Sequence, residues 1–290
     1  HADLTYVMAA AEEIGRALTG YTVVVTKSTV PVGTNRKVHD AVTGVAPEAE
    51  FDVASNPEFL REGAAVSDFM NPDRIVIGCR SAEAETTMRA IYQTFDRDGT
   101  EIIATTLETS ELIKYSANAF LATKVAFINE MSNLCDATGA NVTDLSKGIG
   151  LDARIGSAFL KPGPGYGGSC FPKDTLALTI QAQEADCPVR IVESVVDSNS
   201  FHIRRLGRRV ADFCADSWGI DRKLPLLGKR IAVLGLAFKA NTDDIRSAAS
   251  TVIIPLLTKQ GAEVVGFDPA AAQTIESVLQ NRERTRGRET

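Results

Sequence analysis

One cysteine in this chain is surrounded by residues that would make its sulfur reactive. Cys170 follows a glycine-rich segment, residues 163–168, and Lys173 and Asp174 come three and four residues after it. Pro172 and the apolar residues beyond it predict the start of a helix, whose free amide groups favour a nearby anion. Because a helix start and a lysine both favour the thiolate, we expect an activated nucleophile in a loop that another molecule can approach closely. The alternative is a Pro/Gly-rich surface turn with an incidental cysteine.

A long helix is expected over residues 106–136, which contain neither glycine nor proline. Apolar residues occupy nearly every face of this stretch, so we expect a helix that is buried on all sides. Lys114 and Asn118 lie four residues apart on one face of it, and a buried lysine is seldom without a partner. The alternative is a lysine whose apolar stem lets its charge reach water.

Polar residues also follow two predicted strands, at residues 22–26 and 51–54. Ligands bind beyond the carboxyl ends of the strands in open parallel sheets, which places Ser28, Thr29 and the segment 55–63 well for binding. The commoner role of such hydroxyl groups is to cap the helix that follows.

The segment 55–63 carries two glutamates four residues apart, Glu58 and Glu62. They would share a face if this segment were helical. By default they are solvated surface charges or partners of Arg61.

The alternation of helical and strand patterns predicts the α/β fold class. Together with the family resemblance given below, this alternation implies two Rossmann-like parallel-sheet domains, both incomplete in this chain, joined by a long central helix. Helices are expected at residues 4–18, 34–42, 82–95, 106–136, 142–148, 153–158 and 188–218, from Pro172 onward, and from Ser247 to Gln260, and strands at 22–26, 51–54, 74–78, 101–103, 229–234 and 262–269.

Composition excludes several functional classes. The net charge of -6, without a dominant basic patch, argues against a nucleic-acid partner. The five cysteines are scattered too widely for a disulfide framework or a zinc site, and they suit a reducing cytoplasm. No stretch is long and apolar enough to span a membrane, so we expect no membrane partner. The cysteine spacing likewise leads us to expect no bound metal. The interrupted basic run at 282–288 is expected to be a disordered tail.

The string Gly-Pro-Gly-Tyr-Gly-Gly-Ser-Cys-Phe-Pro-Lys-Asp at residues 163–174 resembles the active-site signature of the UDP-glucose/GDP-mannose dehydrogenase family. Further resemblances are Ser-Thr-Val-Pro-Val-Gly from residue 28, Asn-Pro-Glu-Phe-Leu-Arg-Glu-Gly at 56–63, the helix from Ile113 to Glu130, and Gly-Leu-Ala-Phe-Lys at 235–239. Ser169 before the cysteine and Phe171-Pro172 after it favour UDP-glucose as the substrate. The alternatives are GDP-mannose or a UDP-N-acetylhexosamine, oxidised in the same way.

The resemblance implies an NAD-dependent oxidoreductase that oxidises UDP-glucose twice at C6 and yields UDP-glucuronate for polysaccharide biosynthesis. Cys170 would form a thiohemiacetal and then a thioester, which water releases. The catalytic residues would be Cys170, Lys114, Asn118, Asp174, Thr29 and Glu58. Lys124 and the pair Asn129-Glu130 fit the same helix pattern, and we expect them to be structural hydrogen-bonding residues.

The resemblance also assigns binding residues. Those for the substrate would be Glu58, Phe59, Leu60, Arg61, Glu62, Lys114, Asn118, Arg154, Phe159, Leu160, Lys161, Pro162, Gly163, Gly167 and Lys239. Arg154 would reach the substrate of a neighbouring subunit, although by itself it reads as a surface ion-pair residue. The single glycine at Gly235 is no dinucleotide fingerprint, so Lys239 would supply the charge for phosphate. NAD would be contacted by Thr29, Glu62, Lys173 and Arg246.

Three regions are expected from these patterns. Residues 1–104 would be the remainder of an NAD-binding Rossmann domain, 105–222 a central helical and dimerisation region with the cysteine loop, and 223–290 a partial UDP-sugar-binding domain. No G-x-G-x-x-G turn precedes the first strand and later strands are absent, so we expect a fragment; the alternative for the isolated chain is an inactive folding and dimerisation core.

The helix at 188–218 carries apolar residues in steps of three and four over more than three heptads. Such a narrow seam suits either a dimer contact or a spine between domains. By resemblance we expect a homodimer or higher oligomer through this helix. The seam residues are Val192, Val195, Val196, Asn199, Ile203, Leu206, Val210 and Phe213.

Overall fold

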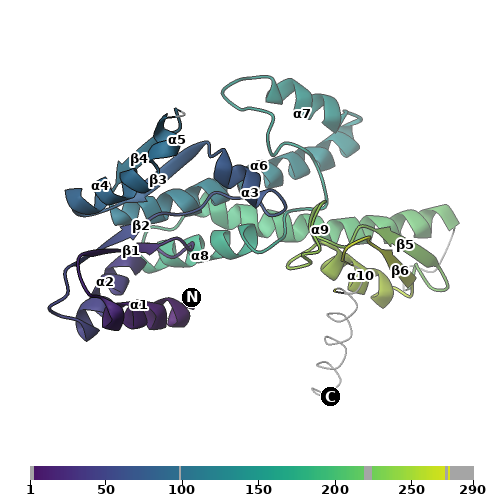
Figure 1. Cartoon of the computed structure of the whole chain (residues 1–290). Helices are drawn as coiled ribbons and strands as arrows, with labels where there is room; N and C mark the ends of the chain where they lie inside the picture. The colour runs from purple at the N-terminus through teal and green to yellow at the C-terminus, as the bar shows by residue number, and fades with distance from the viewer. Residues whose placement is uncertain (1–2, 98, 219–223, 272–273, 275–290) are drawn as a thin grey trace, which may run out of the picture. The chain divides into compact units, whose positions relative to one another are not determined.

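The computed structural model of the chain describes residues 3–97, 99–218, 224–271 and 274. The boundary expected between residues 222 and 223 and the basic run at 282–288 lie outside the described residues. The chain divides into two compact units (Figure 1). The first unit comprises residues 1–117 and 180–186, and the second comprises residues 118–179 and 187–290.

The first unit is built on a four-stranded sheet with the strand order β1-β2-β3-β4. The pairs β1/β2 and β3/β4 are parallel, whereas β2 and β3 meet in one antiparallel pairing, between Ser55 and Gly78. Its elements are α1 (Thr5–Ala17), β1 (Thr22–Thr26), α2 (Thr34–Val45), β2 (Phe51–Ser55), α3 (Ala65–Met70), β3 (Arg74–Gly78), α4 (Ala82–Ile91), α5 (Gln93–Arg97) and β4 (Glu101–Thr105).

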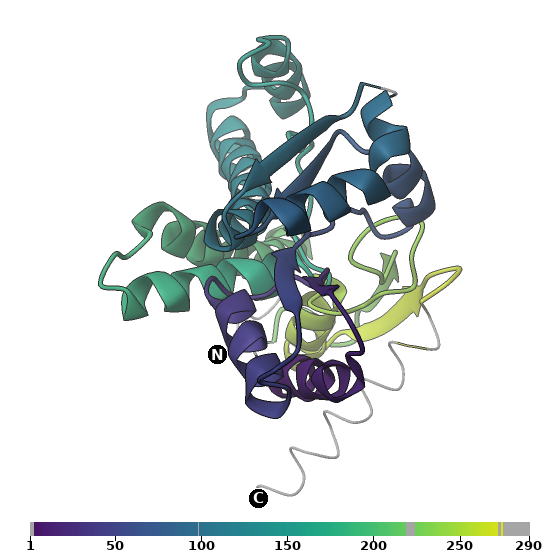
Figure 2. The same ribbon diagram turned by 60° about the vertical axis from the view of Figure 1, so that its left-hand side comes forward.

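Apolar side chains hold this sheet to its helices. Ala11, Val24, Val38, Val42 and Val53 form one cluster, which packs α1 and α2 against β1 and β2 (Figure 2). A second cluster joins β2 and β3 to α4 through Ala54, Ile75, Ile77, Met88 and Tyr92. The β-branched run of β1 suits such a sheet, because each buried valine or isoleucine contributes about 1.5–3 kcal/mol.

The loop that contains Thr29 is fixed by a carboxylate from the next long helix. The amides of Gly33 and Asn35 donate to Glu111 at 2.6 and 2.8 Å, and Gly33 is the N-cap of α2 with φ 90°. The default prediction that Ser28 and Thr29 cap this helix is therefore wrong. Burial raises the pKa of Glu111, and the hydrogen bonds from Asn35 and Gly33 oppose this shift.

Helix α6 (Leu107–Thr138) has the length expected for it, but it is not buried on all sides. Four of its large apolar residues are exposed: Leu112 (43%), Phe120 (66%), Phe127 (46%) and Leu134 (54%). The reason is the distribution of side-chain sizes. Small residues at i, i+3 and i+7, namely Ala119, Ala122 and Ala126, are buried and allow close packing on one face.

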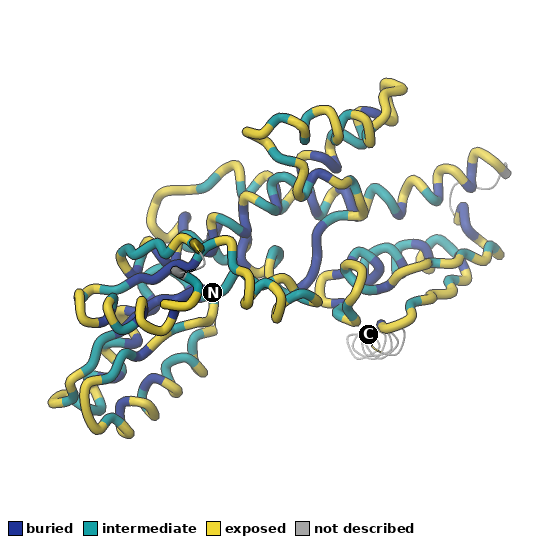
Figure 3. The backbone as a smooth tube through the Cα atoms, turned by 45° about the horizontal axis from the view of Figure 1, so that its top comes forward, coloured by how far each residue is buried: buried dark blue, intermediate teal, exposed yellow. Residues whose placement is uncertain are grey.

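The second unit is mainly helical. Besides the later part of α6, it contains α7 (Val142–Gly150), most of α8 (Phe171–Glu184), α9 (Arg190–Trp218), β5 (Arg230–Leu234), α10 (Ser250–Lys259) and β6 (Glu263–Phe267). Strands β5 and β6 pair in parallel. Buried and exposed positions alternate along the long helices (Figure 3).

One expectation about this unit is wrong. Residues 153–158 form turns and not a helix, because the chain turns back on Asp152 and Gly156 takes φ 71°. The apolar seam of α9 packs within the unit at Val195, Asn199 and Ile203, which are all buried. These three residues are therefore covered within the chain, whereas the seam residue Phe213 is 68% exposed.

The glycines of the cysteine loop lie against the chain itself. A Cβ atom on Gly165, whose φ is +113°, would come within 2.8 Å of both Asn199 Oδ1 and Ile203 Cγ1. One on Gly168 would meet the Phe238 ring at 2.8 Å, and one on Gly167 would overlap the Ser247 carbonyl. Close packing within the second unit therefore requires these glycines, and a plain surface turn does not describe the loop.

Gly165 provides a test of this packing. We expect Gly165→Ala to lower the free energy of unfolding by about 1–3 kcal/mol, because its backbone conformation is strained for any other residue. Gly163→Ala is the matched control, since its Cβ would meet nothing within 4 Å. Urea denaturation followed by circular dichroism measures both. Equal stability of the two variants would contradict the packing role of Gly165.

Candidate active site

The first unit contains an ion pair between two of the predicted residues, a buried lysine and a partly exposed glutamate. Lys114 Nζ lies 3.2 Å from Glu58 Oε1, and Lys114 is buried. The other carboxylate oxygen of Glu58 accepts the amide of Leu60 at 2.5 Å. The Phe59 ring lies 3.8 Å from the Arg74 guanidinium and 5.3 Å from the Lys114 ammonium. The prediction that Lys114 is buried with a partner is confirmed.

A second polar cluster in this unit was missed by the sequence analysis. Lys27 Nζ donates to Asn56 Oδ1 at 3.0 Å, the Tyr92 hydroxyl donates to the same oxygen at 2.5 Å, and Asn56 Nδ2 donates to the Val76 carbonyl at 2.8 Å. Partial desolvation lowers the pKa of Lys27; Glu58 opposes that shift and Lys114 adds to it. Lys27 and Asn56 are the first residues after β1 and β2. Their position beyond the carboxyl ends of two parallel strands could have identified them as candidate site residues.

The segment after β2 is not helical, so Glu58 and Glu62 do not share a helix face. Arg61 pairs with Asp68 of α3, through its backbone amide at 2.8 Å and its guanidinium at 2.6 and 2.9 Å. Of the two glutamates, Glu58 pairs with Lys114, and the contact of Arg61 that the structure defines is with Asp68. Thr29 is half-buried in the loop before α2.

In the second unit, the predicted nucleophile stands next to a buried carboxylate. Cys170 is exposed and directly precedes α8, and the Asp174 amide donates to its carbonyl at 2.8 Å. The Asp174 carboxylate is 1% exposed, and it accepts from Asn118 Nδ2 at 2.6 Å and from Lys173 Nζ at 2.6 Å. The fold thus brings Asn118, Cys170, Lys173 and Asp174 together, although Asn118 is more than fifty residues away in the chain.

The other cysteines differ from Cys170 in exposure or environment. Cys135 and Cys214 are buried, whereas Cys187 is exposed. Burial raises the pKa of Cys79 to about 11, and the carboxylates of Glu85 and Asp52 add to the shift. Cys170 and Cys187 are therefore the two accessible thiols.

The turn after β5 contains its own anion. The Asp268 carboxylate accepts the amides of Leu236 and Ala237 at 2.7 and 3.1 Å, and also those of Ala270 and Ala271. These hydrogen bonds hold the pKa of Asp268 well below its usual range. In a dinucleotide-binding turn, backbone amides of this kind donate to phosphate. Here the amides of Leu236 and Ala237 donate to Asp268, so a phosphate at this turn would need a different donor.

The remaining predicted binding residues are spread over several loops of the second unit. Lys239 Nζ lies 5.4 Å from the Phe238 ring centroid, and Arg246 pairs with Asp244 at 2.8 Å. Arg154 is exposed and pairs with Asp152, as its alternative reading anticipated.

The segment 159–163 is anchored at its apolar end. Phe159 has φ 63°, and its ring centroid lies 6.0 Å from that of Phe171. Leu160 is buried and its carbonyl accepts from Ser146 at 2.6 Å, whereas Lys161 and Gly163 are exposed and Pro162 is intermediate.

The three α6 residues expected to be structural do form such bonds. Lys124 donates to the carbonyls of residues 155 and 156 at 3.0 and 3.1 Å, Asn129 accepts the Gly163 amide at 2.9 Å, and Glu130 accepts from Ser198 at 2.5 Å. Within the described ranges, no cluster of three or more histidine, cysteine or acidic side chains could hold a metal ion. No described helix is both long and apolar enough to cross a membrane.

Comparisons with known proteins match most of the chain to one family. Models of the UDP-glucose/GDP-mannose dehydrogenase family match residues 1–96 (NAD binding domain), 108–201 (central domain) and 232–287 (UDP binding domain). The UDP-glucose 6-dehydrogenase of Rhizobium meliloti (strain 1021) is 51% identical over 282 residues, which are 97% of this chain and 63% of that protein. The UDP-glucose 6-dehydrogenase TuaD of Bacillus subtilis (strain 168) is 46% identical over 96% of this chain and 58% of its own length.

A solved structure is similar over nearly the same share of this chain. The UDP-glucose dehydrogenase from the hyperthermophilic archaeon Pyrobaculum islandicum has 40% sequence identity and a TM-score of 0.87, over 96% of this chain and 62% of that one. The chain thus spans less than two thirds of the length of each of these relatives.

The two accessible thiols provide a test of reactivity. We expect iodoacetamide at neutral pH to modify Cys170 before Cys187, because Cys170 has a helix start and Lys173 beside it. Cys79 should stay unlabelled, since a thiol with a raised pKa remains protonated. Peptide mapping by mass spectrometry measures the order. Lys173→Ala should slow Cys170 and leave Cys187 unchanged; earlier labelling of any other cysteine would contradict the prediction.

Proposed function

Because the chain belongs to the UDP-glucose/GDP-mannose dehydrogenase family, we propose that it carries the catalytic residues of an NAD-dependent UDP-glucose 6-dehydrogenase. The observation that carries the proposal is the exposed Cys170 at the start of α8, with the buried Asn118–Asp174 pair one turn further on. The names of the similar relatives support UDP-glucose as the substrate.

Cys170 divides a difficult oxidation into easier steps. A hydride and a proton leave the C6 alcohol of UDP-glucose to give an aldehyde, and Cys170 Sγ then bonds to C6 to form a thiohemiacetal. Loss of the second hydride from C6, together with the hydroxyl proton, gives a thioester. Water adds to this thioester, the carbon–sulfur bond breaks, and UDP-glucuronate and the thiolate are released.

Asp174 and Asn118 have spare capacity for this chemistry. Asp174 is a carboxylate held in place by two donors, so it can accept the proton of the attacking water. Asn118 uses one amide hydrogen on Asp174 and retains a second one. That hydrogen would stabilise the oxygen at the reacting carbon, an effect worth roughly 3 kcal/mol per donor.

Lys114 would be the second donor to that oxygen. Its ammonium has three hydrogens and Glu58 accepts only one, while the burial of Lys114 strengthens its interaction with a developing negative charge. Both oxygens of Glu58 are engaged, on Lys114 and on the Leu60 amide. Glu58 therefore orients Lys114 in this proposal, and with Thr29 it assists the hydrolytic step.

The residues proposed to contact NAD fit a nucleotide cofactor. NAD, when bound, accepts the two hydrides, one on each of two molecules. Thr29 and Glu62 follow the carboxyl ends of the parallel strands β1 and β2, where cofactors bind in open α/β sheets. Lys173 and Arg246 complete the proposed set.

The residues proposed to contact UDP-glucose are those that the family resemblance assigns. Lys239 supplies the positive charge for phosphate, since Asp268 already occupies the turn amides. Arg154 would reach the substrate of a neighbouring subunit. The other proposed contacts are Glu58, Phe59, Leu60, Arg61, Glu62, Lys114, Asn118, Phe159, Leu160, Lys161, Pro162, Gly163 and Gly167.

The activity is tested with the protein that carries this chain. We expect UDP-glucose and NAD to give two NADH for each UDP-glucuronate formed, and GDP-mannose and UDP-N-acetylglucosamine to give far less. Lys114→Ala should lower kcat about 10²–10³-fold with little change in UDP-glucose affinity, because it acts on the transition state. Exposed Lys37→Ala is the control. An unchanged kcat with a raised KM would assign Lys114 to substrate binding; equal turnover of all three sugars would contradict the proposed substrate.

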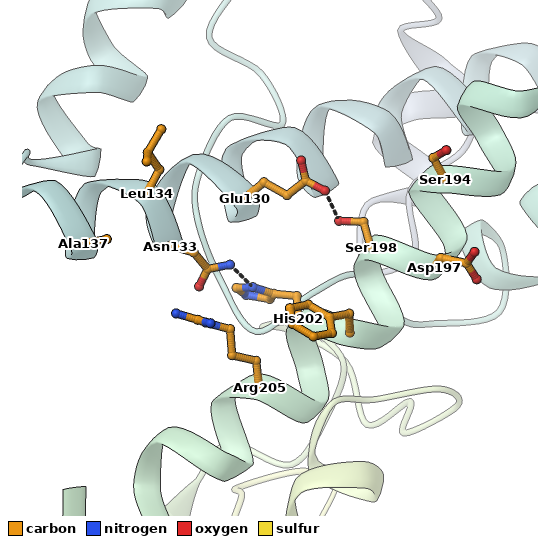
Figure 4. Close-up of a pocket in the computed structure, with 10 residues that line it drawn as sticks. Glu130, Asn133, Leu134, Ala137, Ser194, Asp197, Ser198, His202 and Arg205 are labelled. Atoms are coloured by element: carbon orange, nitrogen blue, oxygen red, sulfur yellow. Dashed lines mark hydrogen bonds between the residues drawn. The ribbon is translucent and has the colours of Figure 1, made fainter. Parts of the chain in front are cut away.

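We further propose that two copies of the chain associate through the exposed face shared by α6 and α9. A groove of about 700 Å³ lies between these helices, with Glu130 and Asp197 on it as well as Arg205 (Figure 4). Exposed Phe120, Phe127 and Leu134 extend it along α6 at steps of seven residues.

Several features of this face favour a second copy as the occupant. Exposed Phe201 belongs to the same groove, and such large apolar patches mark association sites. The groove offers both acidic groups and Arg205, so the same face on a second copy can be complementary in charge. We also propose a cytoplasmic location for the protein, because all five cysteines are free thiols and a reducing compartment keeps thiols free.

The dimer is tested by size-exclusion chromatography with light scattering. We expect twice the chain mass for the unmodified protein and the monomer mass for Phe201→Asp, because a buried unpaired carboxylate would oppose association. Val66→Asp, at an exposed apolar position on α3, is the control and should remain dimeric. A monomeric unmodified protein, or a dimeric Phe201→Asp, would refute this interface.

A further inference from the structure

The loop that precedes Cys170 is held by side chains from two helices. Asn129 Oδ1 of α6 accepts the Gly163 amide at 2.9 Å, and His202 Nε2 of α9 lies 2.9 Å from the Gly163 carbonyl. His202 must donate there, so its Nδ1 is the acceptor for Asn133 Nδ2 at 3.3 Å. Both Asn129 and His202 are buried.

Asn199 of α9 makes the most complete contact with this loop. The Tyr166 amide donates to Asn199 Oδ1 at 2.8 Å, and Asn199 Nδ2 donates to the Tyr166 carbonyl at 3.1 Å. Asn199 is 7% exposed, so both groups would lack a partner if the loop moved. Gly165 has no side chain where Asn199 Oδ1 approaches, which allows the pairing.

Tyr166 transmits this restraint toward the thiol. Its ring meets that of Phe171 edge-on, with 5.9 Å between centroids and 79° between planes. The two rings belong to one apolar cluster with Ala122, Ala126 and Val195. Phe171 is both the neighbour of Cys170 and the first residue of α8, so its position sets where the thiol stands relative to the helix start.

We propose that Asn199 is a positioning residue for Cys170: its paired hydrogen bonds to Tyr166 fix the loop that seats Phe171 and therefore the thiol at the start of α8. The inference rests on the proposed function, in which Cys170 is the nucleophile. Asn199 acts on the thiol through Tyr166 and Phe171.

The test is the alkylation rate of Cys170 divided by that of Cys187 on the same molecule, measured against pH. In Asn199→Ala the ratio should fall about threefold or more, because a displaced thiol would lose the helix start and the Lys173 charge that favour the reactive thiolate. Ser198→Ala, the adjacent residue that bonds Glu130, is the matched control and should keep the ratio. A folded Asn199→Ala with the unmodified ratio would overturn the proposal.

Two further measurements cover a variant that fails to fold. Asn199→Asp has nearly the same shape but cannot donate to the Tyr166 carbonyl, so it should also lower the ratio; an unmodified ratio would overturn the proposal. In the unmodified protein, hydrogen exchange of the peptide containing Tyr166 should be slow, and rapid exchange there would likewise overturn it.

The alkylation assay needs neither NAD nor a sugar, so it separates this inference from the proposed function. In a dehydrogenase assay, Asn199→Ala should lower kcat by a larger factor than it raises the KM for UDP-glucose, because the same loop carries the proposed contacts Gly163 and Gly167. An alkylation ratio that falls in a protein without dehydrogenase activity would reject the proposed function and retain the role of Asn199.

Discussion

A polar group that leaves water must find a partner inside the protein, and helix α6 buries such groups along its length. Four of these groups bond to a candidate site residue or to the loop that contains one. Glu111 binds the loop of Thr29, Lys114 binds Glu58, Asn118 binds Asp174, and Asn129 binds the glycine loop. Within each unit, loops far apart in the sequence are therefore held by the part of α6 that belongs to that unit. The buried polar residues of α6 are Ser110, Glu111, Lys114, Asn118 and Asn129.

The same helix explains why the chain exposes an apolar surface. Its buried face carries small residues such as Ala122 and Ala126, so neighbouring elements approach closely and its polar side chains can reach their partners. The large residues Phe120, Phe127 and Leu134 are left on the other face. Internal packing and the proposed contact with a second copy thus share a single cause, the distribution of side-chain size around α6.

The cysteine loop illustrates how rigidity supports reactivity. A glycine-rich segment is costly to order, since glycine loses much conformational freedom on folding. Asn199 and Asn129 offset this cost with hydrogen bonds to the loop backbone, and Gly165 and Gly168 permit contacts that side chains would prevent. The thiol is thereby held at the helix start before any ligand arrives, and such preorganisation is how a fold lowers the barrier of a bond-forming step.

The sequence by itself determined what depends on neighbours in the chain. Residues 22–26 and 74–78 predict strands at the bounds that the structure has, because β-branched runs between turns leave little choice. The position of Cys170 before a helix and the need of Lys114 for a partner follow from local pattern and from the cost of burying a charge. The tertiary structure alone decided which distant groups meet: Glu111 with the start of α2, Arg61 with Asp68, and Asn199 with Tyr166. An apolar seam reads the same whether it packs inside a unit or against another chain, so only the fold could show that Asn199 faces inward.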